Sequence, residues 1–343
     1  MITKEIIREI CLEKSTIPIE KLDFNAYDYR VATDKTPEWI NQNFERSKWE
    51  EMDYGSFKNE VLEFISTNWR GKVEFDWKCG GSQCDIYLPE ISKAFKLLGL
   101  FESSEINVNK KNQLNSYTDF EKEGIHLVQI FEDSWNLKKD LVKNRILNTI
   151  GLSQKIWARK CSIKVVTDSK LIREFINSSH IQGHIGAAIK LGLFLGDEMV
   201  AIMTFGSLRK NLGQTGKAGS YELLRFCNKF GVNVVGGASK LFNHFIKTYN
   251  PVSVISYADK CWSFSSNCLY TKLGMIKVHD SDPSYFYIIG TKRKGRYAYR
   301  KDVVISTGFD GKYVGEHTGM ISMDIYRIFD VGTSKFVYDV MKK

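Results

Sequence analysis

The sequence predicts a mixed α/β (α+β) protein with two domains. Its 343 residues are enough for about two domains of ordinary size. Short strand-like runs alternate with amphipathic stretches of helical period, which is typical of helices layered on sheets. Two apolar runs joined by Gly196-Asp197 predict a β-hairpin, so the central sheet of the second domain is expected to be mixed.

In the first half of the chain, turn residues separate the predicted elements. Gly80-Gly81 lies between two strand-like runs and predicts a hairpin. A helix and a buried strand follow, and then a basic amphipathic helix. The predicted elements are the hairpin strands 73–77 and 85–88, the helix 117–123, the strand 125–131 and the helix 138–152.

The second half begins with a helix and contains most of the expected strands. Pro251 ends a helix and precedes a continuous apolar run, as expected for a buried strand. The predicted elements are the helices 169–177, 239–249 and 267–273, the hairpin 191–205, and the strands 221–227, 252–257 and 285–289. We therefore divide the chain into a helical lead-in, two modules and a basic C-terminal extension, at 1–70, 71–160, 165–290 and 291–343.

Composition and charge limit the class of protein. Hydrophobic residues make up 43% and charged residues 26% of the chain, which excludes a disordered or collagen-like protein. The net charge of +9 makes a polyanion the first partner to consider, and double-stranded DNA is the expected one. Seven irregularly spaced cysteines predict reduced thiols. Without an apolar signal segment or membrane span, the expected location is the cytoplasm, with no membrane partner.

A glycine turn between a predicted strand and a predicted helix is a candidate anion site. Backbone N–H groups at such a turn, together with the positive end of the helix, can hold a pyrophosphate. With the segment Asn267-Cys-Leu-Tyr-Thr-Lys-Leu-Gly-Met275, this turn resembles the GNAT acetyltransferase superfamily. The resemblance implies an acyl-CoA-like donor, although Asn233 departs from the usual Gln or Arg. The implied cofactor-binding residues are Asn233, Val235, Gly236, Gly237, Ala238 and Ser239.

Residues 170–290 more closely resemble the Mom-type DNA-modifying branch of that fold. The matching pieces are His180, the hairpin 191–205, Glu222-Leu-Leu-Arg225, Gly236 to Leu241 and Ser256-Tyr-Ala-Asp259. The resemblance implies phage origin and modification of adenine at N6 in DNA. Either Asp259 or His180 would then accept the proton, and Arg225 would hold an anionic donor or a phosphate. The implied catalytic residues are His180, Arg225, Asp259 and Tyr270.

Residues 72–150 resemble the very-short-patch-repair (Vsr) type of nuclease domain, of restriction-endonuclease-like fold, found in phage homing endonucleases. The matching segments are Cys84 to Glu90 and Gly124 to Trp135. Such a centre needs carboxylates to bind a divalent metal. Asp85 fits the metal-binding aspartate of that family. Lys96 and Ser103 stand where an acid and a histidine are expected, so we expect a degenerate centre and leave open whether a divalent metal binds. Its remaining acids are Asp85, Glu132 and Asp133.

The segment from Lys292 to Lys301 carries six basic residues interleaved with Tyr297 and Tyr299. Basic groups can neutralise phosphates, and aromatic rings can contact bases or sugars. We therefore expect this segment to contact nucleic acid. The candidate residues are Lys292, Arg293, Lys294, Arg296 and Tyr297.

Taken together, these patterns favour a DNA-binding transferase of the Mom-like GNAT type. Two alternatives remain open. One is a Vsr-like homing endonuclease that cuts DNA, and the other is a catalytically inactive DNA-binding accessory protein. The donor molecule, the DNA sequence recognised and the oligomeric state do not follow from the sequence.

Overall fold

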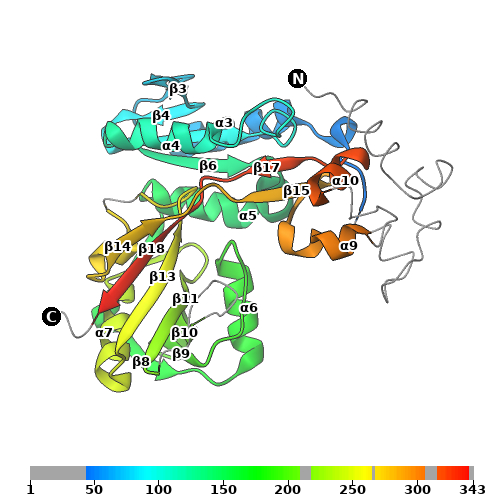
Figure 1. The fold of residues 1–343 in the computed structure, drawn as a ribbon. Coiled ribbons are helices and arrows are strands. Elements are labelled where there is room, and N and C mark those ends of the chain that lie inside the picture. The colour runs from blue at the N-terminus through cyan, green and yellow to red at the C-terminus, as the bar shows by residue number, and fades with distance from the viewer. Residues whose placement is uncertain (1–43, 209–217, 265–266, 306–314, 340–343) are drawn as a thin grey trace.

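The computed structural model describes residues 44–208, 218–264, 267–305 and 315–339. Figure 1 shows a smaller sheet flanked by helices above a larger, twisted sheet, which confirms the mixed α/β class. Within these ranges, no helix is long and apolar enough to cross a membrane. The first helix expected in the lead-in, near Lys4, lies outside the described residues.

The smaller sheet belongs to the N-terminal module, residues 54–149, and its strand order is β1-β4-β5-β6. Strands β5 and β6 pair in parallel from Lys93↔His126 to Leu98↔Phe131, because α4 crosses between them. All six residues of β6 are buried, as in a strand covered on both faces. The strands are β1 (Glu74–Phe75), β4 (Ile86–Leu88), β5 (Lys93–Leu98) and β6 (His126–Phe131), and the helices are α3 (Tyr54–Asn68), α4 (Asn112–Lys122) and α5 (Glu132–Thr149).

The predicted hairpin around Gly80-Gly81 is present in the N-terminal module. Strand β1 pairs with β4 in antiparallel fashion, and the short strands β2 (Lys78–Cys79) and β3 (Ser82–Gln83) form its tip. Gly80 has φ +59°, a conformation that favours glycine.

Helix α5 begins directly after β6, six residues before the predicted start at Lys138. Lys138 has the non-helical angles φ −140° and ψ 40°, so a kink divides the helix there. The first segment anchors the helix through Trp135, which is fully buried and donates a hydrogen bond from Nε1 to Glu60 at 2.8 Å. The regular periodicity read from the sequence therefore covers only the part of α5 beyond the kink.

The larger sheet forms the C-terminal module, residues 154–339, with the order β14-β18-β13-β11-β10-β9-β8. The hairpin predicted at Gly196-Asp197 is confirmed, because β9 and β10 are antiparallel and Gly196 has φ +61°. The strands are β8 (Ser162–Val165), β9 (Ile189–Leu195), β10 (Glu198–Ser207), β11 (Ser220–Asn228), β13 (Ser253–Asp259), β14 (Ile276–Asp280) and β18 (Thr333–Asp339), and the helices are α6 (Ser169–Ser179), α7 (Gly237–Tyr249) and α8 (Leu269–Lys272).

Between β14 and β18 the chain makes an excursion to the N-terminal module. It forms a three-stranded sheet of order β16-β15-β17, whose Ile288 and Ile328 join one hydrophobic core with Phe95 and Trp135. The chain then returns as β18, which lies between β14 and β13, so the segment predicted as a basic extension supplies an inner strand of the larger sheet. The elements are β15 (Tyr285–Ile289), β16 (Lys292–Gly295), η7 (Arg296–Tyr299), α9 (Lys301–Ile305), α10 (Glu316–Ser322) and β17 (Arg327–Phe329).

Five shorter elements complete the connections. Strand β7 (Gln154–Trp157) pairs in parallel with β12 (Val232–Val235), which leads into α7. The short 3-10 helices are η3 (Trp49–Glu51), η4 (Pro89–Ile91) and η5 (Ala158–Lys160). The 3-10 helix η5 separates β7 from β8.

Strands β11 and β13 form a parallel ladder of only three residue pairs, from Ser220↔Ser253 to Glu222↔Ile255. Beyond Ile255 the two strands no longer pair with each other, although both continue. The ends of β11 and β13 that have separated from each other border a cavity. This opening in the larger sheet positions the candidate site.

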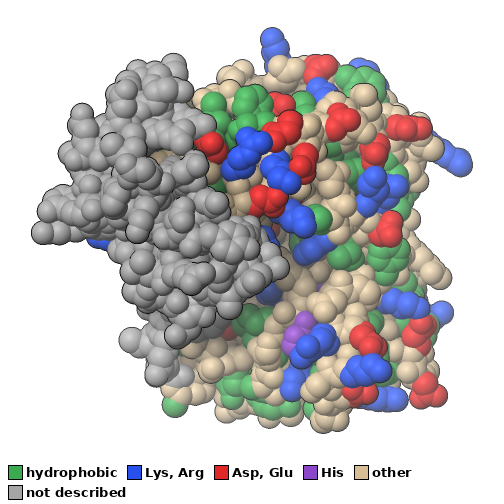
Figure 2. All heavy atoms as spheres, turned by 90° about the vertical axis from the view of Figure 1, so that its right-hand side faces the viewer, with side chains coloured by type: hydrophobic (Ala, Val, Ile, Leu, Met, Phe, Trp, Pro, Cys, Tyr) green, Lys and Arg blue, Asp and Glu red, His purple; other side chains and the backbone are tan. Residues whose placement is uncertain are grey.

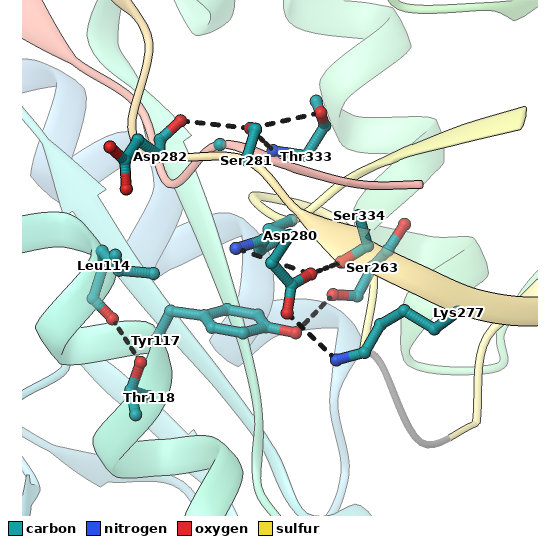
Figure 3. A network of polar contacts seen from close by, with 12 residues as sticks. Leu114, Tyr117, Thr118, Ser263, Lys277, Asp280, Ser281, Asp282, Thr333 and Ser334 are labelled. Carbon is teal, nitrogen blue, oxygen red and sulfur yellow. Dashed lines mark hydrogen bonds and ion pairs between the residues drawn. The ribbon is translucent and has the colours of Figure 1, made fainter. Parts of the chain in front are cut away.

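A polar network joins α4 to the C-terminal module (Figure 3). Tyr117 donates a hydrogen bond to the Ser263 carbonyl oxygen at 3.4 Å. Nearby, Asp280 accepts a hydrogen bond from Ser334 at 2.5 Å and pairs with Lys277 at 3.1 Å. Burial opposes ionisation of Asp280, but these hydrogen bonds outweigh it and lower its pKa. The network fixes the wall of the cavity that β18 and the turn after β13 share.

Replacing Phe336 with Ala should lower the free energy of unfolding by about 3–5 kcal/mol, because a fully buried ring on β18 leaves a cavity. The measurement is urea unfolding monitored by far-UV circular dichroism. Val337→Ala, at the next residue of β18 and only partly buried, should cost about 1 kcal/mol. Equal effects of the two changes would contradict the placement of β18.

Candidate active site

A cavity of about 560 Å³ lies where β11 and β13 separate. Its size is in the usual range for small-ligand sites. The candidate catalytic residues come from separate elements, and all of them line this cavity: His180, Arg225, Asp259 and Tyr270. The structure therefore brings together the residues that the sequence proposed, while their chemical roles stay a prediction.

Asp259 is the last residue of β13 and is half-buried. Its Oδ1 accepts a hydrogen bond from the Cys261 backbone N–H at 2.9 Å, which fixes the carboxylate in the turn after the strand. Its Oδ2 makes no hydrogen bond with any residue that the structure describes. One oxygen of a positioned carboxylate is thus available to a ligand.

Tyr270 lies on α8 and closes the cavity beside Asp259. Its ring stacks on Phe336 with 5.0 Å between centroids, and its hydroxyl donates to the Tyr257 carbonyl oxygen at 3.3 Å. Burial raises the pKa of the phenol. Tyr270 therefore stays protonated near neutral pH and can act as a proton donor.

His180 follows α6 and is half-buried at the cavity. Burial, together with the positive charges of Arg145 and Arg225, lowers its pKa to about 3, so the imidazole is neutral near pH 7. Its Nδ1 accepts a hydrogen bond from the Gln182 N–H at 3.2 Å, which places the proton on Nε2. Of the two proton acceptors considered from the sequence, Asp259 fits better, because neutral His180 presents a donor.

Arg225 has a different environment from the one that the sequence implied. Its Nε donates to the Gly183 carbonyl oxygen and a terminal nitrogen donates to the Leu224 carbonyl oxygen, both at 2.8 Å. These bonds hold the loop after α6 against β11. Arg225 thus positions the segment that carries His180, and the expectation that it holds an anionic donor or a phosphate stays a prediction.

Sequence reasoning missed Arg145, which reaches the cavity from α5 of the N-terminal module. It also lines a second cavity of about 260 Å³ that continues along β11 past His180 to Val232. A further cavity, of about 390 Å³, shares Asp259 and leads between the modules. In the sequence, Arg145 is one of several cations on a basic amphipathic helix, and no local pattern distinguishes it.

The glycine turn at the start of α7 lies outside all three cavities. Gly236 has φ +77°, and a Cβ on Gly237 would lie 3.0 Å from Val234 Cγ1, so backbone conformation and packing account for both glycines. The smallest cavity ends at Val232, one residue before Asn233. None of these three cavities reaches the turn itself, so the binding of a donor at the turn stays a prediction.

The acids of the nuclease-like centre are each engaged within the protein. Asp85 pairs with Lys58 and accepts a hydrogen bond from the Leu97 N–H, both at 2.7 Å. Glu132 accepts from the Leu100 N–H at 3.0 Å. Across the described ranges, no group of three His, Cys, Asp or Glu residues could hold a metal ion. These contacts support the expectation of a degenerate centre.

Buried lysine and serine occupy the rest of that centre. Lys96 Nζ donates to the Ser116 hydroxyl at 2.7 Å, and burial lowers the pKa of this lysine. Ser103, where a histidine was expected, is also buried. A cation at this place repels a divalent metal ion.

The basic segment divides into exposed and internal residues. Arg293 donates from Nε to Asp133 Oδ1 at 2.8 Å, and its guanidinium lies 3.7 Å from the centroid of the Phe131 ring. An internal ion pair thus engages the charge of Arg293, and its contact with nucleic acid stays a prediction. The exposed members are Lys292, Lys294, Arg296 and Tyr297.

Figure 2 shows one face of the molecule, on which positive and negative side chains are interspersed over the described surface. The net charge of +9 is not gathered into a single patch on this face. Any contact with a polyanion there depends on local groups of cations.

No family model and no curated protein matched the sequence. Solved structures gave likenesses over about half of the chain. A Bacillus subtilis acetyltransferase in complex with CoA has 10% identity, covers 53% of this chain and 99% of its own, and has a TM-score of 0.31. The ribosomal-protein-S18-alanine N-acetyltransferase of Escherichia coli has 10% identity, 52% and 94% coverage, and a TM-score of 0.31. The IAA acetyltransferase of Bacillus cereus has 13% identity, 52% and 99% coverage, and a TM-score of 0.31.

The protein should not cleave duplex DNA with Mg²⁺ or Mn²⁺, because Lys58 pairs with Asp85 and the charge of Lys96 also acts on this carboxylate. The measurement is nicking and linearisation of supercoiled plasmid, with Asp85→Asn as the matched control. Metal-dependent cleavage by the wild-type protein that disappears in the Asp85→Asn variant would restore the nuclease alternative.

Proposed function

We propose that the protein is a group transferase that acts on a DNA base, with the N6 amino group of adenine as acceptor. The observation that carries the proposal is the convergence of Asp259, Tyr270 and His180 on one cavity between β11 and β13. A carboxylate can accept a proton, and a protonated phenol and a neutral imidazole can donate one, as transfer of a group to an amine needs. Phage origin, implied by the Mom-type resemblance, belongs to the same proposal.

The acceptor nitrogen is a weak nucleophile, so the site must orient it and remove its proton. Asp259 Oδ2 accepts the proton of the amino group as the new N–C bond forms. The bond from that carbon to its leaving group breaks, and the Tyr270 hydroxyl donates a proton to the leaving atom. His180 contributes a hydrogen-bond donor and, through the loop held by Arg225, borders the cavity.

An acyl-CoA-like donor would supply the activated carbon when bound. The residues of this chain that would meet its extended part line the smaller cavity, from His180 through Phe226 and Asn228 to Val232. Asn233 and Gly236 would lie beyond that cavity at the start of α7.

A base inside a duplex cannot enter a cavity of this kind, so the adenine would leave the stack. The cavity volume of about 560 Å³ leaves room for a purine beside the reacting end of a donor. The net charge of +9 supports the choice of DNA as the macromolecular partner.

Asp259→Asn should abolish base modification and leave DNA affinity nearly unchanged, because the carboxylate acts in the transition state and not on the phosphate backbone. Nucleosides from DNA of cells expressing each protein would be compared by mass spectrometry. Asp282→Asn, at an exposed acid, is the matched control.

Modified adenine at the normal level with Asp259→Asn would contradict the mechanism. An unmodified DNA pool with the wild-type protein, together with tight DNA binding, would favour the accessory alternative.

Replacing Lys292, Lys294 and Arg296 with Ala should weaken DNA binding and reduce the salt slope of log K by up to about 2.7, since each phosphate contact contributes about 0.9. Fluorescence anisotropy over a salt series measures both quantities. A matched triple change at the exposed Lys155, Lys170 and Arg173 controls for net charge. Equal losses in the two variants would show that the basic segment is no specific DNA surface.

A further inference from the structure

Arg145 is the cation that borders both the main cavity and the smaller cavity along β11. Its guanidinium lies over the Trp262 ring, 4.7 Å from the centroid. Across the residues that the structure describes, this guanidinium has no hydrogen bond and no ion pair. Burial lowers the pKa of Arg145.

Two of the other three cations of α5 have polar partners inside the protein. Lys138 donates to the Ile181 carbonyl oxygen at 2.6 Å, and Lys139 pairs with Glu60, also at 2.6 Å. Lys143, like Arg145, lies over an aromatic ring, that of Phe64 at 5.2 Å, but it lines none of the three cavities. A partly buried charge without a hydrogen-bonding partner inside the protein is costly, so the arrangement around Arg145 needs a reason.

The charged groups that face Arg145 leave it unneutralised at short range. Asp259 interacts with it electrostatically, but no ion pair links the two side chains. His180 is neutral, and Arg225 adds a second positive charge on the β11 side. The space between α5 and β11 is therefore suited to an anionic group.

We propose that Arg145 binds a carboxylate or phosphate of the ligand that occupies the two joined cavities. The planar guanidinium donates two parallel hydrogen bonds to either group, a geometry that a lysine ammonium lacks. This inference rests on the proposed function, because it treats the cavity as a transfer site. The N-terminal module then contributes a ligand-binding residue to the active site.

The position of Arg145 also orders the ligand. An elongated molecule that runs from Asp259 toward Val232 passes Arg145, because this residue borders both cavities. The reacting end then lies beside Asp259 and Tyr270, and the anionic group lies beneath α5. Closure of the site by α5 makes the two modules interdependent in binding.

The test is calorimetric titration with inorganic pyrophosphate and with malonate, at constant ionic strength, which separates a phosphate site from a carboxylate site. Wild-type protein should bind one of the probes at one site, and Arg145→Gln should weaken that binding at least about tenfold. Arg145→Lys should retain part of the affinity. Arg173→Gln, at an exposed arginine on α6, should bind as the wild type does.

Unchanged binding by Arg145→Gln, or binding of neither probe by the wild type, would overturn the inference. Loss of binding in a protein that modifies no base would leave the inference standing while the proposed function fails. Adenine modification by the wild-type protein, together with probe binding that Arg145→Gln leaves unchanged, would support the proposed function and overturn the inference.

Thermal unfolding distinguishes a ligand-binding arginine from a structural one, because the two roles predict opposite changes in Tm when the arginine is replaced. Arg145→Met should leave the Tm of the unliganded protein unchanged or raised, because it removes a desolvated charge that has no ion-pair partner. The bound probe should raise the Tm of the wild type and leave that of the variant unchanged. A lower Tm for unliganded Arg145→Met would assign the residue to the fold instead.

Discussion

The parallel pairing between β11 and β13 is short, and the position of the candidate site depends on where it ends. Hydrogen bonds join the strands over three residue pairs, and beyond Ile255 their facing edges separate. On their other edges β13 stays paired with β18 along its whole length, and β11 stays paired with β10. The sheet stays continuous while a gap opens at its centre, and side chains from α5, β11, β13, α8 and β18 and from the adjoining loops line it.

Acids of the N-terminal module form ion pairs inside the protein. Asp85 neutralises Lys58, and Asp133 neutralises Arg293 from the excursion between β14 and β18. The second pair links residues 160 positions apart and fastens the excursion to α5. The same helix carries Arg145 to the cavity, so α5 links the fastening of the excursion to the lining of the candidate site.

Much of the larger sheet could be predicted from sequence, because its hairpin turn, its buried runs and its helix periods are local signals. The convergence of His180, Asp259 and Tyr270 came from a resemblance and not from spacing. Arg145 and the internal pairing of Arg293 could not be found, since both depend on contacts between distant segments. The kink at Lys138 and the inner position of β18 were missed for the same reason.

The late position of β18 in the chain has a consequence for synthesis. Until the ribosome has added Thr333 to Asp339, β13 and β14 each expose an unpaired strand edge, and Thr333 is missing from the wall of the cavity. Exposed edges of this kind invite pairing with other chains. The nascent protein therefore passes through a stage in which most strands of the larger sheet have been synthesised but β18 has not. The need for chaperone binding should be greatest during that stage.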